Sequence, residues 1–338
     1  MPTTLKDVAI RAGVSTSAVS RTFTDGASVS VKMRRKVEKA ANELGYRPNF
    51  LARSLTTRRT KLIGLVSNNF HNPIFLEVFD LFTRSLQDRG LRPLLVNLSD
   101  ETDPEHSVQM LQQYSVDGVV VTSSTLPPAF SMAFRDKHIP VVNTFGRYSS
   151  TPEVHVVGID NVQAGRMAAA TLVARGYRKV AFLGGPQSAT SSQDRLKGFA
   201  EEIAKHPDVT MTTSFATAYS FQAGRTELLR LAQGNGAQTP LAEAYFCGDD
   251  VLSIGVLSAA KDLGLRVPET LGVIGFNDME MAGWENIALT TIRQPIKQII
   301  TSSVELMVAM LDEPDRYPEA RLFPCHLVER ETLRSLPT

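Results

Sequence analysis

The sequence predicts a small all-α head of the helix-turn-helix type, followed by a larger α/β body of two lobes with parallel sheets. Three observations support this fold class. Positive charge is concentrated in residues 1–60, apolar residues recur there at helical spacing, and from Lys61 onward short apolar runs alternate with helical stretches. Because a basic helical segment and an apolar α/β segment are different kinds of domain, we expect a boundary near residue 60.

Composition limits the class of protein. The chain has 338 residues, of which 43% are hydrophobic and 21% charged, so two or three folded units are expected and a disordered chain is excluded. Two cysteines, Cys247 and Cys325, are too few for a disulfide framework, which favours a reducing compartment. The chain shows no signal-peptide pattern at its start and no run of about 18 apolar residues. We therefore expect a soluble cytoplasmic protein.

The net charge of +1 hides a strong asymmetry. Residues 1–60 contain twelve Lys and Arg but only four acidic residues, a net charge of +8, which leaves −7 for residues 61–338. A basic head on an acidic body indicates that the head binds a polyanion. The alternative interpretation is a basic face that is merely solvated.

The head is expected to contain short helices separated by turns. Apolar residues in the segment 5–12 are spaced at i, i+3, i+4 and i+7, which predicts a first helix that ends at Gly13. Ser15 lies where the N-cap of a second helix belongs, and Ser30 can cap a third helix that Gly45 ends. Two helices joined by a short turn containing glycine match the helix-turn-helix pattern.

The body is expected to alternate strands and helices. Near-continuous apolar strands with helices between them are typical of parallel sheets covered on both faces. The clearest helices are 161–175, 194–205 and 250–263, the last with Asp250 as its N-cap and Gly264 as its stop. The expected strands span 62–67, 91–98, 118–123, 139–145, 154–160, 179–185, 211–215, 244–250 and 271–278.

Two series of strands begin alike, with Lys-Leu-Ile-Gly-Leu at residue 61 and Lys-Val-Ala-Phe-Leu at residue 179. Two similar α/β lobes in tandem place a cleft between them, where the carboxyl ends of the strands can hold a ligand. We expect the first lobe to contain about 62–160 and 293–320, and the second about 161–292 and 321–338, so that the chain crosses between the lobes three times.

The sequence lacks the motifs of common enzymes. It contains no phosphate-binding glycine loop, no dinucleotide-binding glycine pattern and no zinc-binding HExxH, and its six histidines are scattered without ligand spacing. We expect no catalytic residues, no metal site and no cofactor. An α/β enzyme and an exported solute-binding protein stay open as alternatives from other classes, although the basic head disfavours both.

Long stretches of both parts match a known pattern. The head contains TLKDVAIRAGVSTSAVSRTF and RRKVEKAANELGYRPNFLARSL, and the body contains GIDNVQAGRMAAATLVARGYRKVAFLGGP, FCGDDVLSIGVLSAAKDLGLRVPETLGVIGFND and LTTIRQP. With these segments the chain resembles the LacI/GalR family over nearly its entire length. The resemblance implies a dimeric transcription regulator, with a helix-turn-helix head (1–60), a hinge helix (49–56) and a body (61–338) similar to periplasmic sugar-binding proteins.

The resemblance also implies which residues meet DNA. The second helix, which begins after Ser15, is expected in the major groove, where Arg21 can contact guanine O6 and N7 together. In the hinge helix, Leu55 falls at the position that wedges into the minor groove and kinks the operator, with Arg53 near phosphate. The other expected DNA-binding residues are Thr16, Ser17, Ser28, Ser30, Lys32, Arg34, Asn49 and Ala52.

A small effector is expected between the lobes. Aromatic faces with a few converging polar groups suit a polyhydroxylated ligand. Many family members carry aspartate where this chain has Asn277, and asparagine keeps an acceptor, adds a donor and removes the charge. A sugar acid, polyol or phosphorylated sugar therefore fits as well as a hexose. An ion pair between Arg195 and Asp249 that only ties the lobe together is the alternative to ligand binding. The expected effector-binding residues are Phe75, Ser191, Arg195, Tyr219, Asp249 and Asn277.

We therefore expect a cytoplasmic homodimeric repressor that binds a pseudo-palindromic operator in double-stranded DNA and responds to a sugar, sugar acid or related metabolite. The open alternatives are an activator and a repressor that depends on a purine-type corepressor. No membrane partner is expected.

Overall fold

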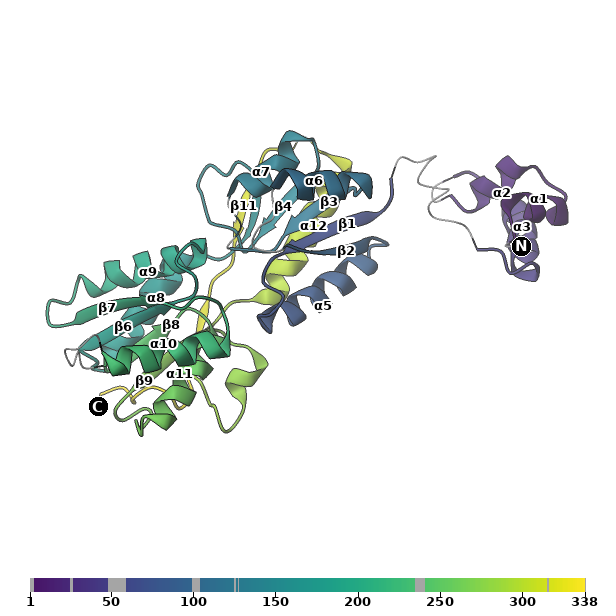
Figure 1. The fold of residues 1–338 in the computed structure, drawn as a ribbon. Coiled ribbons are helices and arrows are strands. Elements are labelled where there is room, and N and C mark those ends of the chain that lie inside the picture. Colours follow the sequence, from purple (N-terminus) through teal and green to yellow (C-terminus); the bar gives the residue numbers. More distant parts are fainter. Residues whose placement is uncertain are drawn as a thin grey trace. The chain divides into compact units, whose positions relative to one another are not determined.

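The computed structural model describes residues 3–24, 27–47, 59–98, 104–124, 126, 128–234, 241–314 and 316–337. The chain separates into two compact units, Met1–Thr60 and Lys61–Thr338, which are described one at a time. Figure 1 labels most of the helices and strands of both. The expected hinge helix, with Asn49, Ala52, Arg53 and Leu55, lies outside the described residues.

The described part of the head contains the helices α1 (Leu5–Ala12), α2 (Thr16–Thr22) and α3 (Val31–Glu43). The predicted caps are confirmed. The Ser15 hydroxyl accepts from the backbone of Ala18 at 3.2 Å, and the Ser30 hydroxyl accepts from the backbone of Met33 at 3.3 Å. These bonds satisfy backbone donors that the first turn of a helix leaves free. The head's small core is a set of fully or nearly buried residues: Val8, Ala9, Ala12, Val19, Val37, Ala40, Ala41 and Tyr46.

The first lobe of the body is a parallel sheet covered on both faces. One face packs against α5 (Ile74–Gln87) and α12 (Ile296–Asp312), and the other against α6 (Pro104–Gln113) and α7 (Pro128–Asp136). The strand order is β11-β5-β4-β3-β1-β2. The strands are β1 (Leu62–Ser67), β2 (Arg92–Asn97), β3 (Gly118–Val121), β4 (Val141–Thr144), β5 (His155–Gly158) and β11 (Ala320–Leu322).

The second lobe repeats this plan with one antiparallel edge, because β12 runs against β10. Its strand order is β12-β10-β9-β8-β6-β7. The strands are β6 (Lys179–Gly184), β7 (Thr210–Phe215), β8 (Ala244–Cys247), β9 (Gly272–Asn277), β10 (Thr291–Arg293) and β12 (His326–Val328). The helices are α8 (Asn161–Ala174), α9 (Thr190–Ile203), α10 (Phe221–Gln233), α11 (Asp250–Asp262) and the short 3-10 helix η1 (Glu280–Gly283).

The lobe boundaries differ slightly from the expected ones. Arg293 still pairs with β9 in the second sheet, and residues 321–322 pair with β5 in the first sheet. The segment that returns to the first lobe therefore runs from residue 294 to Leu322. Strand pairing decides these positions, and it cannot be read from local apolar pattern.

Two helix starts also differ from the sequence-based expectation. Helix α9 begins at Thr190 instead of residue 194, and the Thr190 N–H donates to the Ser124 carbonyl of the first lobe at 2.8 Å. Helix α11 has Asp249 as its N-cap, with its carboxylate accepting from Val251, so Asp250 was wrongly expected to be the cap. The start of α9 has a partner that is distant in the sequence, whereas the α11 cap is a local bond, and Asp250 accepts instead from Thr291 and Met279.

Helices α8 and α9 cross in direct backbone contact at two glycines. A Cβ atom on Gly198 would lie 1.8 Å from the Val162 carbonyl oxygen, and one on Gly165 would lie 2.1 Å from the Arg195 carbonyl oxygen. Any larger residue must therefore push the two helices apart. Because α9 carries Ser191 and Arg195, this contact also fixes where those side chains lie.

We expect Gly198→Ala to lower the free energy of unfolding of the body by about 1–3 kcal/mol, the usual cost of overpacking. Chemical denaturation of the purified chain measures the change. The control is Lys197→Ala, an exposed position on the same helix, for which a change within about 0.5 kcal/mol is expected. Equal stability of Gly198→Ala and wild type would show that the helices can separate without cost.

Candidate functional site

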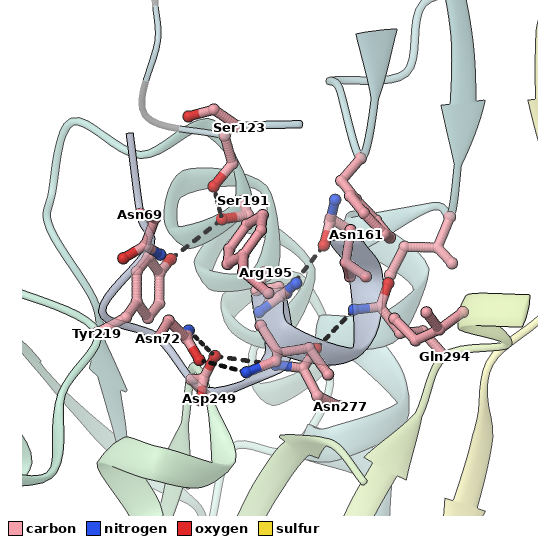
Figure 2. Close-up of a pocket in the computed structure, with 17 residues that line it drawn as sticks. Asn69, Asn72, Ser123, Asn161, Ser191, Arg195, Tyr219, Asp249, Asn277 and Gln294 are labelled. Atoms are coloured by element: carbon pink, nitrogen blue, oxygen red, sulfur yellow. Dashed lines mark hydrogen bonds between the residues drawn. The ribbon is translucent and has the colours of Figure 1, made fainter. Parts of the chain in front are cut away.

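A pocket lies in the body where the two lobes meet, beside the carboxyl ends of the strands (Figure 2). All six residues expected to bind the effector line it: Phe75, Ser191, Arg195, Tyr219, Asp249 and Asn277. The structure thus brings together side chains from both lobes that are up to about 200 residues apart in the sequence. Further lining residues are Asn69, Asn72, Ile74, Val78, Ser123, Ser124, Phe145, Ile159, Asn161, Gln294 and Ile296.

Asp249 is the acidic group of the pocket and is 3% exposed. Its Oδ2 accepts from Nδ2 of Asn72 and from Nδ2 of Asn277, each at 2.9 Å, and its Oδ1 accepts from the Val251 backbone at 2.8 Å. Asn72 belongs to the first lobe, just before α5, whereas the other two donors belong to the second lobe. The carboxylate therefore joins the lobes at the floor of the pocket.

Burial raises the pKa of Asp249 to about 6, because removal from water disfavours the charged form. The hydrogen bonds from Asn72, Val251 and Asn277, and the positive charge of Arg195, act in the opposite direction. Asp249 is consequently ionised at neutral pH and becomes protonated in mild acid. Burial also raises the pKa of the neighbouring Asp250 well above its usual range.

Asp250 does not line the pocket, but its hydrogen bonds hold the turn that carries Asn277, which does. It is fully buried and accepts from the Thr291 hydroxyl at 2.5 Å and from the Met279 backbone at 2.7 Å. These bonds hold the turn after β9, in which Asn277 and Asp278 both have positive φ, 111° and 59°. Few side chains other than Asn and Asp tolerate such backbone. The turn directs Asn277 toward Asp249, and Gln294 donates to the Asn277 amide oxygen at 2.6 Å.

Arg195 lies on α9, within the expected helix 194–205, and its guanidinium has three contacts. Its Nε donates to Oδ1 of Asn161 at 2.8 Å, its Nη1 donates to the Gly248 carbonyl at 2.6 Å, and its guanidinium stacks on the Phe276 ring at 3.5 Å. Burial lowers the pKa of this guanidinium, although the Asp249 charge opposes the shift. Among the described residues none accepts from Nη2.

The alternative ion pair between Arg195 and Asp249 is not formed. Their charged atoms do not come within 4.0 Å, and each group has other partners among the described residues. The two opposite charges therefore lie in one pocket without neutralising each other directly.

Ser191 and Tyr219 form the opposite wall. The Tyr219 hydroxyl is 3.0 Å from the Ser191 hydroxyl and 2.8 Å from the Ser192 hydroxyl. Ser191 also donates to the Ser124 hydroxyl of the first lobe at 2.9 Å, which is a second polar bridge between the lobes. The Phe75 ring, packed near Phe79 with 5.8 Å between centroids, adds a partly exposed aromatic face from α5.

Sequence reasoning missed four amide side chains that line the pocket: Asn69, Asn72, Asn161 and Gln294. Asn161 and Gln294 each come within three residues of the end of a strand, β5 and β10, and that position was the signal that could have identified them. Asn72 has no such signal, because it precedes a helix and reaches the pocket only through its partner Asp249.

The residues expected to read DNA lie on one stretch of the head. Thr16, Ser17 and Arg21 are on α2 and are exposed, and Nε of Arg21 donates to the Ser17 carbonyl at 3.4 Å. Ser28 and Lys32 are exposed as well.

Ser30 and Arg34, which are expected to bind DNA, also make structural contacts within the head. Ser30 caps α3, and Nη1 of Arg34 donates to the Thr22 carbonyl at 2.8 Å, which ties α3 to the end of α2. Arg34 is half-buried, so less of its guanidinium is available to DNA than the sequence suggested.

Among the residues that the structure describes, no group of three or more His, Cys, Asp or Glu is arranged to hold a metal ion. No helix in the described part of the chain is long and apolar enough to cross a membrane.

Family models match both units. Residues 4–49 match the bacterial regulatory proteins of the lacI family, and residues 169–333 match the periplasmic binding protein-like domain. Among curated proteins, the transcriptional repressor PurR of Pectobacterium carotovorum is 31% identical over 99% of this chain and 98% of its own. The transcriptional repressor CytR of Escherichia coli is 28% identical over 99% of this chain and 97% of its own.

Solved structures agree with this relationship. The lac repressor dimer bound to operator and the anti-inducer ONPF has a TM-score of 0.88 at 24% identity, covering 99% of this chain and 100% of that one. The regulator CelR in complex with cellobiose has a TM-score of 0.72 at 26% identity, covering 98% and 99%. The resemblance seen in the sequence and the predicted fold class are confirmed: the chain belongs to the LacI/GalR family of DNA-binding transcriptional regulators, and not to a family of enzymes.

Proposed function

We propose that this chain is a cytoplasmic, homodimeric repressor that binds a pseudo-palindromic operator through its head and a small polar effector in the pocket of its body. The observation that carries the effector part is the hydrogen bond between Asn72 of the first lobe and Asp249 of the second, made inside a pocket that both lobes line. A ligand that competes for these polar groups acts on the joint between the lobes.

The pocket chemistry supports a compact ligand rich in hydroxyl groups. Amides, hydroxyls, one carboxylate and one guanidinium converge beside the aromatic faces of Phe75 and Tyr219. Asp249 offers only acceptors when it is ionised, Arg195 only donors, and Asn277 both. That set suits a sugar, polyol or sugar acid. The complex of the similar regulator CelR with cellobiose supports the same class.

Effector binding is proposed to act by changing the angle between the lobes. Both lobes of each subunit contact the ligand, and the first lobe begins directly after the hinge segment. A change of angle moves the two hinge segments of a dimer apart or together, which couples the effector site to the operator site.

The head is proposed to read base edges with α2 in the major groove. Arg21 is the main candidate, because its exposed guanidinium can donate to guanine O6 and N7 together. Lys32, at the start of α3, suits a phosphate contact.

Binding to DNA from the chain's own upstream region should weaken steeply with salt, because the +8 head releases counterions from phosphate. Fluorescence anisotropy between about 50 and 200 mM salt measures this, with an expected loss of at least about tenfold. An affinity that does not change with salt, or no binding to that region, would contradict the proposed operator function.

Arg21→Ala should reduce operator affinity by about 1–3 kcal/mol and relax base preference at one position of each half-site. Competition against a library of operator variants measures both effects. Lys32→Ala is the matched comparison, for which we expect a uniform loss on all sequences and a smaller salt slope. If Arg21→Ala weakens operator and random DNA equally, Arg21 contacts phosphate and not a base.

A thermal-shift screen of sugars, polyols, sugar acids and nucleobases should return a ligand whose affinity depends on Asn277 and on pH. With the strongest hit, Asn277→Ala should cost about 1–3 kcal/mol in calorimetric titration, because ligand groups lose their partner. Lys197→Ala, away from the pocket, is the control.

The direction of the pH dependence distinguishes neutral from anionic effectors. A neutral polyol donates to ionised Asp249, so its affinity should fall as the pH falls through about 6. A sugar acid is repelled by the same charge, so its affinity should rise over that range. Wild-type affinity in Asn277→Ala together with no pH dependence would place the effector outside this pocket.

A further inference from the structure

Arg147 reaches from the first lobe to the second at the rim of the body. It follows β4 and contacts the first turn of α9 in the second lobe. Its Nε is 3.0 Å from Oδ2 of Asp194, and its Nη2 is 2.9 Å from Oδ1 of the same carboxylate. Nη2 also donates to Oε1 of Gln193 at 2.9 Å and lies 3.4 Å from the Thr190 carbonyl.

This contact belongs to the strong class of ion pairs. A guanidinium that meets a carboxylate with two nitrogens on two oxygens is specific in geometry as well as in charge. The Asp194 side chain is only 16% exposed, and that of Arg147 is 42% exposed, so water screens the pair less than it screens a fully exposed one.

Arg147 does not line the effector pocket, but the helix turn that it holds does. Ser191 and Arg195 project from the same turns of α9 into the pocket. Beside them, the Thr190 N–H donates to the Ser124 carbonyl of the first lobe at 2.8 Å. An inter-lobe ion pair and an inter-lobe backbone hydrogen bond therefore grip the start of one helix.

We propose that Arg147 and Asp194 form a latch that holds the lobes closed over the pocket, which makes Arg147 a positioning residue for Ser191 and Arg195. As a consequence, Arg147 sets how readily the lobes open, and hence the affinity for the effector, without touching it. The effect on effector affinity rests on the proposed function, but the latch itself can be tested without effector or DNA.

Residue-resolved hydrogen exchange of the full-length chain, free of ligand, tests the latch. The Thr190 amide reports lobe opening, because its acceptor lies on the other lobe. The Gln193 amide reports the integrity of the helix, because it donates to Ala189 within the same turn at 3.1 Å. We expect Arg147→Ala to accelerate exchange at Thr190 by about tenfold and to leave Gln193 unchanged.

The control is Arg166→Ala. Arg166 on α8 forms an ion pair with Glu201 on α9, at 2.6 Å, and both residues lie within the second lobe. We expect this variant to leave Thr190 exchange unchanged. Acceleration of Thr190 by the control as strong as that by Arg147→Ala, or no acceleration by Arg147→Ala, overturns the latch. Acceleration of Thr190 and Gln193 together also overturns it, because the helix end is then fraying.

A double-mutant cycle with Asp194→Asn completes the test. If the two residues act as one pair, the double variant should open no more than Arg147→Ala alone. Additive effects on Thr190 exchange would show that each residue acts separately, which contradicts a latch. Because no ligand is present in any arm, these outcomes are independent of whether the proposed effector class is right.

Discussion

A carboxylate removed from water needs hydrogen-bond donors from the protein. Much of the pocket's structure depends on which groups donate to Asp249. Its donors are Asn72, which precedes α5 in the first lobe, the Val251 backbone at the start of α11, and Asn277 at the end of β9. Leaving one oxygen without a partner would cost about 1–3 kcal/mol or more. The closed arrangement of the lobes is therefore linked to the ionisation and pairing of one side chain. A ligand that takes over any of these bonds changes that arrangement.

The packing around the pocket leaves α9 little freedom to move. At the α8–α9 crossing, glycines let backbone meet backbone, so α9 cannot slide without a clash. At its other end α9 is fixed by Arg147 and by the Ser124 carbonyl, both in the first lobe. A rigid helix held at its start by the opposite lobe transmits lobe motion to Ser191 and Arg195 as a unit. The glycine packing and the inter-lobe ion pair thus both restrain α9.

Sequence patterns correctly predicted the helix caps and strands that depend on interactions between nearby residues. The caps at Ser15 and Ser30 and all nine expected strands appear, because serine capping and apolar runs act within a few residues. The six residues predicted for the effector site line one pocket. The errors at the start of α9 and in the missed Asn72 share one cause, because each is determined by a partner far away in the sequence that a local pattern does not contain. At the start of α11 both Asp249 and Asp250 suit a cap, and Asp250 accepts instead from the distant residues Thr291 and Met279.

The same electrostatics explain why asparagine suits position 277 in this chain. Its Nδ2 lies 2.9 Å from an oxygen of Asp249, and burial has already raised the pKa of that carboxyl to about 6. The adjacent residue, Asp250, is a second buried carboxyl with a raised pKa. A carboxylate at 277 would replace that donor by a like charge, so one of the pair would have to keep a proton at neutral pH. Gln294 would then face a group whose charge depends on its neighbour. With Asn277, Asp249 stays ionised at neutral pH and both of its pocket donors are neutral amides. The site is then left with one negative and one positive charge that do not pair directly, and a ligand can meet both.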